Sequence, residues 1–149
     1  MSILFTLLYL CASTHETIYF QKGLRKVFFS AYTYYRGVST DRNGLITSFD
    51  VIEANEGEGF NEESGRFRAP VAGTYQFDFF GYVGNEKIQT KVTIYKDDSD
   101  IYSFWGTASA TLKYTWMLKV SSGEEVYLKL VPGKLQSVSF SGQLLKADD

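Results

Sequence analysis

The chain of 149 residues has room for one domain, and its hydrophobic fraction of 44% allows a substantial core. Aromatic residues make up 17% of the chain, whereas the formal net charge is only −2, so neither a disordered chain nor a nucleic-acid partner is expected. The single cysteine, Cys11, and the single histidine, His15, exclude an intrachain disulfide and a Cys/His zinc cluster.

The first residues form an apolar run, and residues 1–13 are predicted to be a signal peptide. The run from Ile3 to Ala12 is too short for a membrane-spanning helix, which needs about 20 residues, so no membrane insertion is expected. Cleavage at the small residues that follow would give a secreted, extracellular chain without cysteine. An apolar strand of the domain, or a truncated gene model, is the alternative. Residues 14–23 are then a short N-terminal segment before a domain at 24–149.

Short alternating segments separated by turn residues predict an all-β sandwich or jelly roll. In chain order the expected strands are 27–35, 45–54, 74–82, 88–96, 110–120, 125–131 and 137–145. The alternation is clearest in 88–96, where every second residue from Ile88 to Ile94 would share one face. No window of a dozen residues shows the periodicity of a helix.

Two of these segments are apolar on both faces, namely 27–35 and the run from Phe77 to Phe80. One face of such a strand can enter the core, but the other meets water unless a partner covers it. The pattern therefore predicts self-association and leaves the number of subunits open.

A set of aromatic, asparagine and glycine residues with specific spacing begins after residue 48. The set comprises Phe49, Asn55, Phe60, Phe67, Gly73, Tyr75, Phe77 and Phe79, and segments 27–31, 123–128 and 139–145 flank it. This pattern resembles the signature of the C1q globular domain, from about Leu24 to Lys146. The resemblance implies a ten-stranded jelly-roll β-sandwich of the C1q and tumour-necrosis-factor type that associates as a homotrimer.

The matched positions are interpreted as packing residues rather than as ligand contacts. Tyr75, Phe77 and Phe79 would share one strand face, and the phenylalanines at 49, 60 and 67 would fill the sandwich. Gly73 is expected to provide a tight turn before its strand, and Gly142 a bulge or a close approach of the backbone. The signature predicts the fold and leaves the binding site open.

Two acidic stretches are interpreted as solvated surface, with a cation site as the alternative for each. The six acids from Asp50 to Glu63 are expected in an exposed loop, and residues 97–100 at a charged hairpin tip. The resemblance implies that some relatives hold calcium with acids in the loop corresponding to residues 102–113, which here contain no carboxylate. No calcium ion or other cofactor is therefore expected.

Three aromatic residues are candidates for ligand binding. Tyr102, Phe104 and Trp105 precede a run of small residues in what is expected to be an exposed loop. Aromatic rings stack on the apolar faces of sugars, and neighbouring hydroxyls can orient them. Burial of Trp105 in a contact between subunits is the alternative.

Two basic pairs are further candidates. Arg66 with Arg68, and Lys87 with Lys91, are candidates for contacts with anionic glycans or lipopolysaccharide.

No spacing of acids, bases or glycines points to catalysis, so the chain is interpreted as a non-enzyme. Together with the resemblance, these features favour a secreted, lectin-like recognition protein of innate immunity that binds microbial-surface or glycan ligands multivalently. A cytokine-like ligand for a cell-surface receptor and a structural extracellular trimer are the alternatives. Because the chain has no collagen stalk, complement activation is not inferred from the resemblance.

Overall fold

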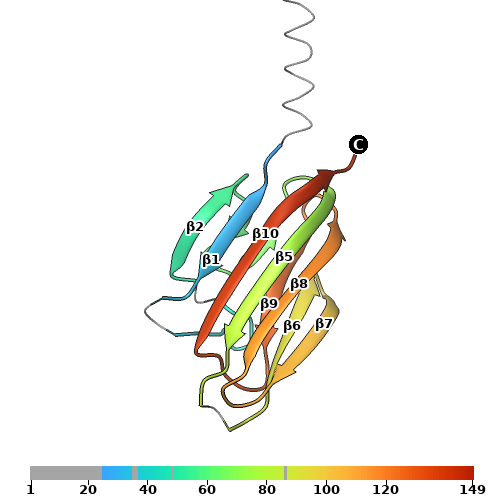
Figure 1. The fold of residues 1–149 in the computed structure, drawn as a ribbon. Helices are drawn as coiled ribbons and strands as arrows, with labels where there is room; N and C mark the ends of the chain where they lie inside the picture. The colour runs from blue at the N-terminus through green and yellow to red at the C-terminus, as the bar shows by residue number, and fades with distance from the viewer. Residues whose placement is uncertain (1–24, 35–36, 48, 86) are drawn as a thin grey trace, which may run out of the picture.

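A computed structural model describes residues 25–34, 37–47, 49–85 and 87–149, which form two antiparallel five-stranded sheets packed face to face (Figure 1). The described residues contain no helix, and the predicted all-β jelly-roll sandwich is confirmed. The signal peptide expected at 1–13, the segment 14–23, Cys11 and His15 lie outside the described residues.

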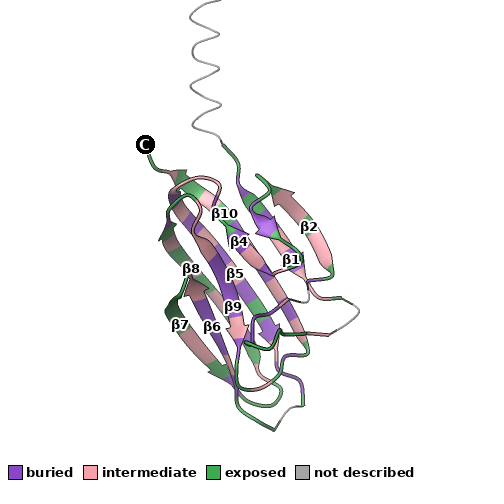
Figure 2. Cartoon of the chain, turned by 180° about the vertical axis from the view of Figure 1, so that it is seen from behind, coloured by how far each residue is buried: buried purple, intermediate pink, exposed green. Residues whose placement is uncertain are grey.

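Each sheet combines strands from distant parts of the chain. In spatial order the first sheet contains β2 (Val51–Glu56), β1 (Phe28–Tyr32), β10 (Ser137–Ala147), β5 (Gly73–Tyr82) and β8 (Thr111–Val120). The second sheet contains β3 (Phe60–Asn61), β4 (Arg66–Arg68), β9 (Glu125–Leu130), β6 (Thr90–Lys96) and β7 (Ser99–Gly106). In Figure 2 buried residues, in purple, recur along inner strands such as β5 and β10, whereas outer strands such as β7 carry more exposed residues, in green.

The core is built around Phe29 of β1, whose side chain is fully buried. Its ring stacks on Phe60 at 4.7 Å and on Phe67 at 5.0 Å, and it meets Phe140 edge-on at 5.0 Å. Because Phe60 and Phe67 belong to the second sheet, these ring contacts hold the two sheets together. Phe49 is also buried, so the prediction that residues 49, 60 and 67 fill the sandwich is confirmed.

The predicted alternation of β5 is confirmed. Tyr75, Phe77 and Phe79 are buried between the sheets, whereas Phe80 faces outward and is 40% exposed. Phe28 of β1, which β10 separates from β5 in the same sheet, is 39% exposed, which confirms that these strands carry apolar residues on both faces. Among the described residues, large apolar side chains are therefore exposed on the outside of the first sheet, where the register places them beside polar neighbours such as Ser139 and Lys113.

Two glycines of the signature allow close packing. A Cβ atom on Gly142 would lie 2.6 Å from Cε1 of Phe29 and 2.8 Å from Cδ1 of Phe77, so the expected close approach is confirmed. The turn expected at Gly73 is wrong, because this residue already belongs to β5. A Cβ atom there would lie 2.4 Å from the carbonyl oxygen of Lys146, so glycine is required by the proximity of β10.

Two predicted strands begin later than expected. In 45–54, Leu45 forms only an isolated bridge with Lys129, and β2 begins at Val51 because the chain first places Phe49 in the core. Ile88 is 63% exposed, because the pairing of β6 with β7 begins at Thr90.

Strands β6 and β7 form a hairpin with an irregular edge. Their turn at Asp97 and Asp98 confirms the charged hairpin tip expected there. Ile94 pairs with Tyr102 but Tyr95 pairs with Asp100, so Ile101 is an extra, bulged residue in β7. This strand ends the second sheet on the same side on which β8 ends the first (Figure 1).

Candidate functional site

The three aromatic candidates lie on strand β7, so the exposed loop expected for them is wrong. Tyr102, Phe104 and Trp105 each pair with a residue of β6, and the loop begins only after Gly106. No local pattern indicates this pairing, because a run of small residues follows the aromatic residues directly.

Strand alternation separates these aromatics onto two faces. Tyr102 stacks on Tyr114 of β8 at 4.7 Å, and Phe104 stacks on the same ring at 5.6 Å. Both rings therefore belong to an aromatic stack that joins β7 of the second sheet to β8 of the first at one side of the sandwich. Trp105 points the other way and is 49% exposed.

The outward surface of β4, β9, β6 and β7 combines basic and aromatic side chains, and we call it the cation–aromatic face. It carries Arg66, Tyr127, Lys129, Tyr95, Lys91 and Trp105. The alternation of β9 places Tyr127 and Lys129 on this face, because Val126, Leu128 and Leu130 point into the core on the opposite side.

On this face each cation lies over a ring. The distances to the ring centroids are 4.1 Å for Arg66 Cζ over Tyr127, 4.6 Å for Lys129 Nζ over Tyr95, and 5.2 Å for Lys91 Nζ over Trp105. Such pairs contribute about 0.5–1 kcal/mol each at exposed sites. They hold long side chains against the sheet and so reduce the entropy lost when a ligand binds.

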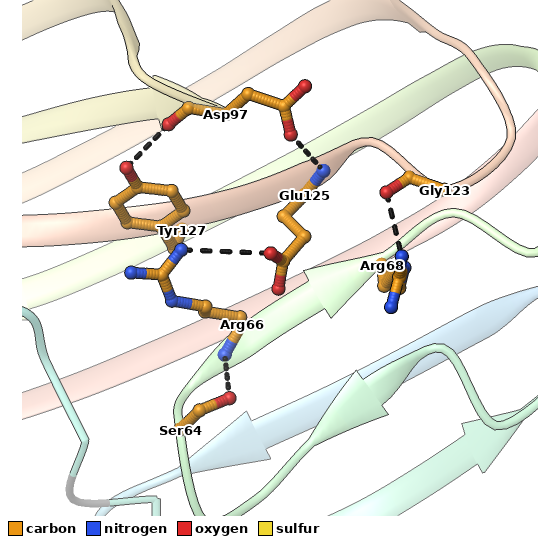
Figure 3. Close-up of polar contacts among 7 residues, drawn as sticks. All are labelled: Ser64, Arg66, Arg68, Asp97, Gly123, Glu125 and Tyr127. Carbon is orange, nitrogen blue, oxygen red and sulfur yellow. Dashed lines mark hydrogen bonds and ion pairs between the residues drawn. The ribbon is translucent and has the colours of Figure 1, made fainter.

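Tyr127 anchors one end of this face (Figure 3). Its hydroxyl donates a hydrogen bond to the carbonyl oxygen of Asp97, and its ring stacks on Tyr95 at 5.4 Å. Burial raises the pKa of Tyr127 above its usual value, while the charge of Arg66 acts in the opposite direction. Arg66 Nη1 also lies 3.8 Å from Oε1 of Glu125, whose backbone N–H donates to the Asp97 carboxylate.

The basic candidates are placed differently from one another. Arg66 and Lys91 lie on the cation–aromatic face with Trp105. Arg68 is exposed at the border of this face, and its Nε donates to the carbonyl oxygen of Gly123 at 3.2 Å (Figure 3). Lys87 is exposed in the connection between β5 and β6.

Three residues of this face were missed by sequence reasoning, namely Tyr95, Tyr127 and Lys129. The alternation in 125–130 places Tyr127 and Lys129 on the same side, and this signal could have identified them. No local pattern shows that β9 lies beside β4 and β6.

The acidic stretches are solvated surface. All six acids from Asp50 to Glu63 are exposed, which confirms the surface interpretation. The loop expected for all of them is wrong in part, because Glu53 and Glu56 belong to strand β2. Within the residues that the structure describes, no three histidine, cysteine or acidic side chains gather as a metal site would require. The expectation that no calcium ion is needed stays a prediction.

No helix in the described part of the chain is long and apolar enough to cross a membrane.

Comparison with known proteins identifies the family and the fold. The family model of the C1q domain matches residues 27–145. Complement C1q tumor necrosis factor-related protein 3 of Homo sapiens and that of Mus musculus are each 29% identical over 116 residues. Each match covers 72% of this chain and 46% of the relative, so the chain spans about half the length of these curated relatives.

Solved structures share the jelly roll at low sequence identity. The globular domain of zebrafish complement 1qA has a TM-score of 0.65 and 18% identity, covering 83% of this chain and 99% of that one. Murine APRIL has a TM-score of 0.63 and 7% identity, covering 80% and 99%. Eiger TNF from S. frugiperda has a TM-score of 0.62 and 8% identity, covering 84% and 96%. With its signature phenylalanines packed between the two sheets and the family model matching residues 27–145, the chain belongs to the C1q domain family.

Proposed function

We propose that the chain is a secreted, lectin-like recognition protein that binds microbial-surface or other glycan ligands multivalently as a homotrimer, without catalysis. The cation–aromatic face carries this proposal. The half-exposed ring of Trp105 can stack on a sugar there, and the cations of the face and the half-buried Ser103 hydroxyl can hydrogen-bond sugar oxygens. Thr93 and Ser103, whose hydroxyls are 2.8 Å apart, lie between the basic side chains.

An open sheet face favours weak individual contacts, because it surrounds little of a ligand. Multivalent binding would compensate for this weakness. When one rigid body carries several copies of a site, later contacts become intramolecular and the overall affinity rises by roughly 10²–10⁴. Homotrimerisation is therefore part of the proposed binding mechanism.

Two exposed apolar surfaces support the homotrimer. The outward surface of the first sheet, which we call the first-sheet face, carries Phe28, Phe80 and Met117, at 39%, 40% and 67% exposure. The side of the sandwich formed by β7 and β8, which we call the β7–β8 edge, exposes Ile101 and Tyr102, at 39% and 48%. A closed threefold ring joins two different surfaces of each subunit, and these two are suitable partners for one another.

Light scattering of the secreted protein and a screen of glycans and microbial surfaces test the proposal. A trimer mass at micromolar concentration and glycan binding that free sugar competes are expected, with no loss in EDTA. A monomer would contradict the trimer, and a strong EDTA effect would contradict the absence of calcium. Saturable binding to host cells stripped of glycans, without glycan binding, would favour a receptor ligand instead.

Processing is tested on the same preparation. Sequencing of the secreted chain is expected to begin near Thr14. An intact start at Met1 would contradict the proposed signal peptide.

A further inference from the structure

The strand register places the three cations of the cation–aromatic face in a diagonal row. Arg66 lies beside Tyr127, because β4 and β9 pair Phe67 with Val126. Lys129 lies two residues further along β9, opposite Thr93 of β6. Because β6 runs antiparallel to β9, Lys91, which precedes Thr93 by two residues, lies a further step in the same direction and opposite Trp105. Because diagonal neighbours in antiparallel sheets are about 7–8 Å apart, the row crosses three strands with even steps.

The charges along this row are unevenly neutralised. Arg66 shares its charge with Glu125, Asp100 pairs with Tyr95, and Asp97 and Asp98 lie at the hairpin turn near Tyr127. Within the described parts of the chain, neither Lys91 nor Lys129 forms an ion pair. The row therefore has unsatisfied positive charge, mainly at its lysine end.

The surroundings of the row suit a sugar chain. Trp105 is half exposed beside Lys91 and offers a ring surface for stacking. The hydroxyl of Ser103 lies on a half-buried side chain between the two lysines. The row itself is linear, as expected for groups that meet charges repeated along a polymer.

We infer that this diagonal row binds an acidic polysaccharide, whose sulfate or carboxylate groups pair with Lys91, Lys129 and Arg66 as the chain crosses β6, β9 and β4. The inference rests on the proposed function and names the ligand class for its site. Charge complementarity selects this ligand, because three fixed cations favour an anionic polymer over a neutral one.

Binding of the secreted full chain to immobilised heparin, a sulfated polysaccharide, tests the inference, with neutral dextran as the uncharged comparison. The variant R66Q/K129Q/K91Q removes the row and is expected to bind heparin about tenfold more weakly or worse. The matched control R25Q/K26Q/K146Q removes three charges elsewhere, from exposed residues next to β1 and in β10, and is expected to bind as the parent does.

Further variants separate charge from folding. The charge-preserving variant R66K/K129R/K91R is expected to keep most of the binding. If R66Q/K129Q/K91Q does not fold, K91Q and K129Q each leave the Arg66–Tyr127 pair intact and are expected to bind about twofold to threefold more weakly.

Three results would overturn the inference. The first is no heparin binding by the parent chain, in which case binding to neutral glycans would still support the proposed function. The second is an equal loss in R66Q/K129Q/K91Q and in the control. The third is row-dependent binding to phosphatidylglycerol vesicles that is tighter than the binding to heparin, because the ligand would then be a lipid surface.

Discussion

The outward surfaces of the two sheets arise from the same strand alternation, but they differ in how far their large side chains are exposed. On the first-sheet face, Phe28, Phe80 and Met117 expose apolar area that no other residue among those that the structure describes covers. On the cation–aromatic face, Tyr127 is almost fully buried because a guanidinium lies over its ring. Burial of exposed apolar area against another subunit lowers the free energy of the assembly. Where cations lie over the aromatic rings, the cations are instead the outermost groups. One face is therefore suited to self-association and the other to an exchangeable ligand.

The largest effect is expected from charges placed on the first-sheet face. The variant F80E/M117E would bury two unpaired carboxylates in each subunit contact, which costs several kcal/mol per carboxylate. Light scattering should show a monomer at a concentration at which the parent is expected to form the proposed trimer. The control I88E/V131E changes two exposed apolar residues outside this face and should stay trimeric. Equal dissociation of both variants would contradict the assignment of the contact to the first-sheet face.

The neighbouring residues Phe28 and Phe29 separate folding from assembly. F29A removes a fully buried ring that contacts both sheets and is expected to lower the free energy of unfolding by about 3–5 kcal/mol. F28A removes an exposed ring and is expected to weaken the trimer while lowering the stability of the isolated subunit by less than about 1 kcal/mol. Urea unfolding at low protein concentration measures both. Equal losses would mean that the two faces of β1 are not distinct.

A smaller change is expected when the acidic neighbour of the cation row is neutralised. E125Q removes the carboxylate that lies 3.8 Å from Arg66 while keeping the size of the side chain. Heparin should then bind about twofold more tightly, because surface ion pairs are worth at most about 1 kcal/mol. E62Q, at an exposed residue outside the row, is the matched control. Unchanged binding in E125Q would place Arg66 outside the binding row.

The smallest effect concerns alkaline pH. Because burial raises the pKa of Tyr127 in the folded state above its ordinary value of about 10, folding keeps the phenol protonated. This stabilisation is complete below that ordinary value and is lost as the pH rises through the higher pKa of the folded state. Urea unfolding between pH 8 and pH 11 should show a shallower decline for Y127F than for the parent. An identical slope would mean that Tyr127 ionises as readily in the folded chain as in the unfolded one.

Sequence reasoning predicted the fold because its evidence is local or family-specific. The period of two in β5 identifies Tyr75, Phe77 and Phe79 as inward residues without knowledge of any neighbouring strand. The spacing that begins at Phe49 then identifies the family, and the family determines the order of the strands.

The candidate site was only partly predictable, because it depends on which strands are neighbours. Arg66, Lys91 and Trp105 were chosen separately for their chemistry, and the structure places them on one face. Lys129 and Tyr95 lie more than thirty residues apart in the chain and meet only because β9 pairs with β6. Topology of this kind arises from packing of the whole sandwich and leaves no trace in any single segment.

The bulge at Ile101 has a consequence for how copies of the chain can meet. Strand β7 ends its sheet, and a straight edge strand would offer its free backbone groups to a strand of another molecule. The extra residue at Ile101 interrupts the regular spacing of those groups and turns the edge out of line. Growth of the sheet from molecule to molecule, the first step toward fibres, is thereby disfavoured. The β7 edge should consequently be a poor starting point for strand pairing between molecules, so contacts between copies of the chain at this edge should involve side chains.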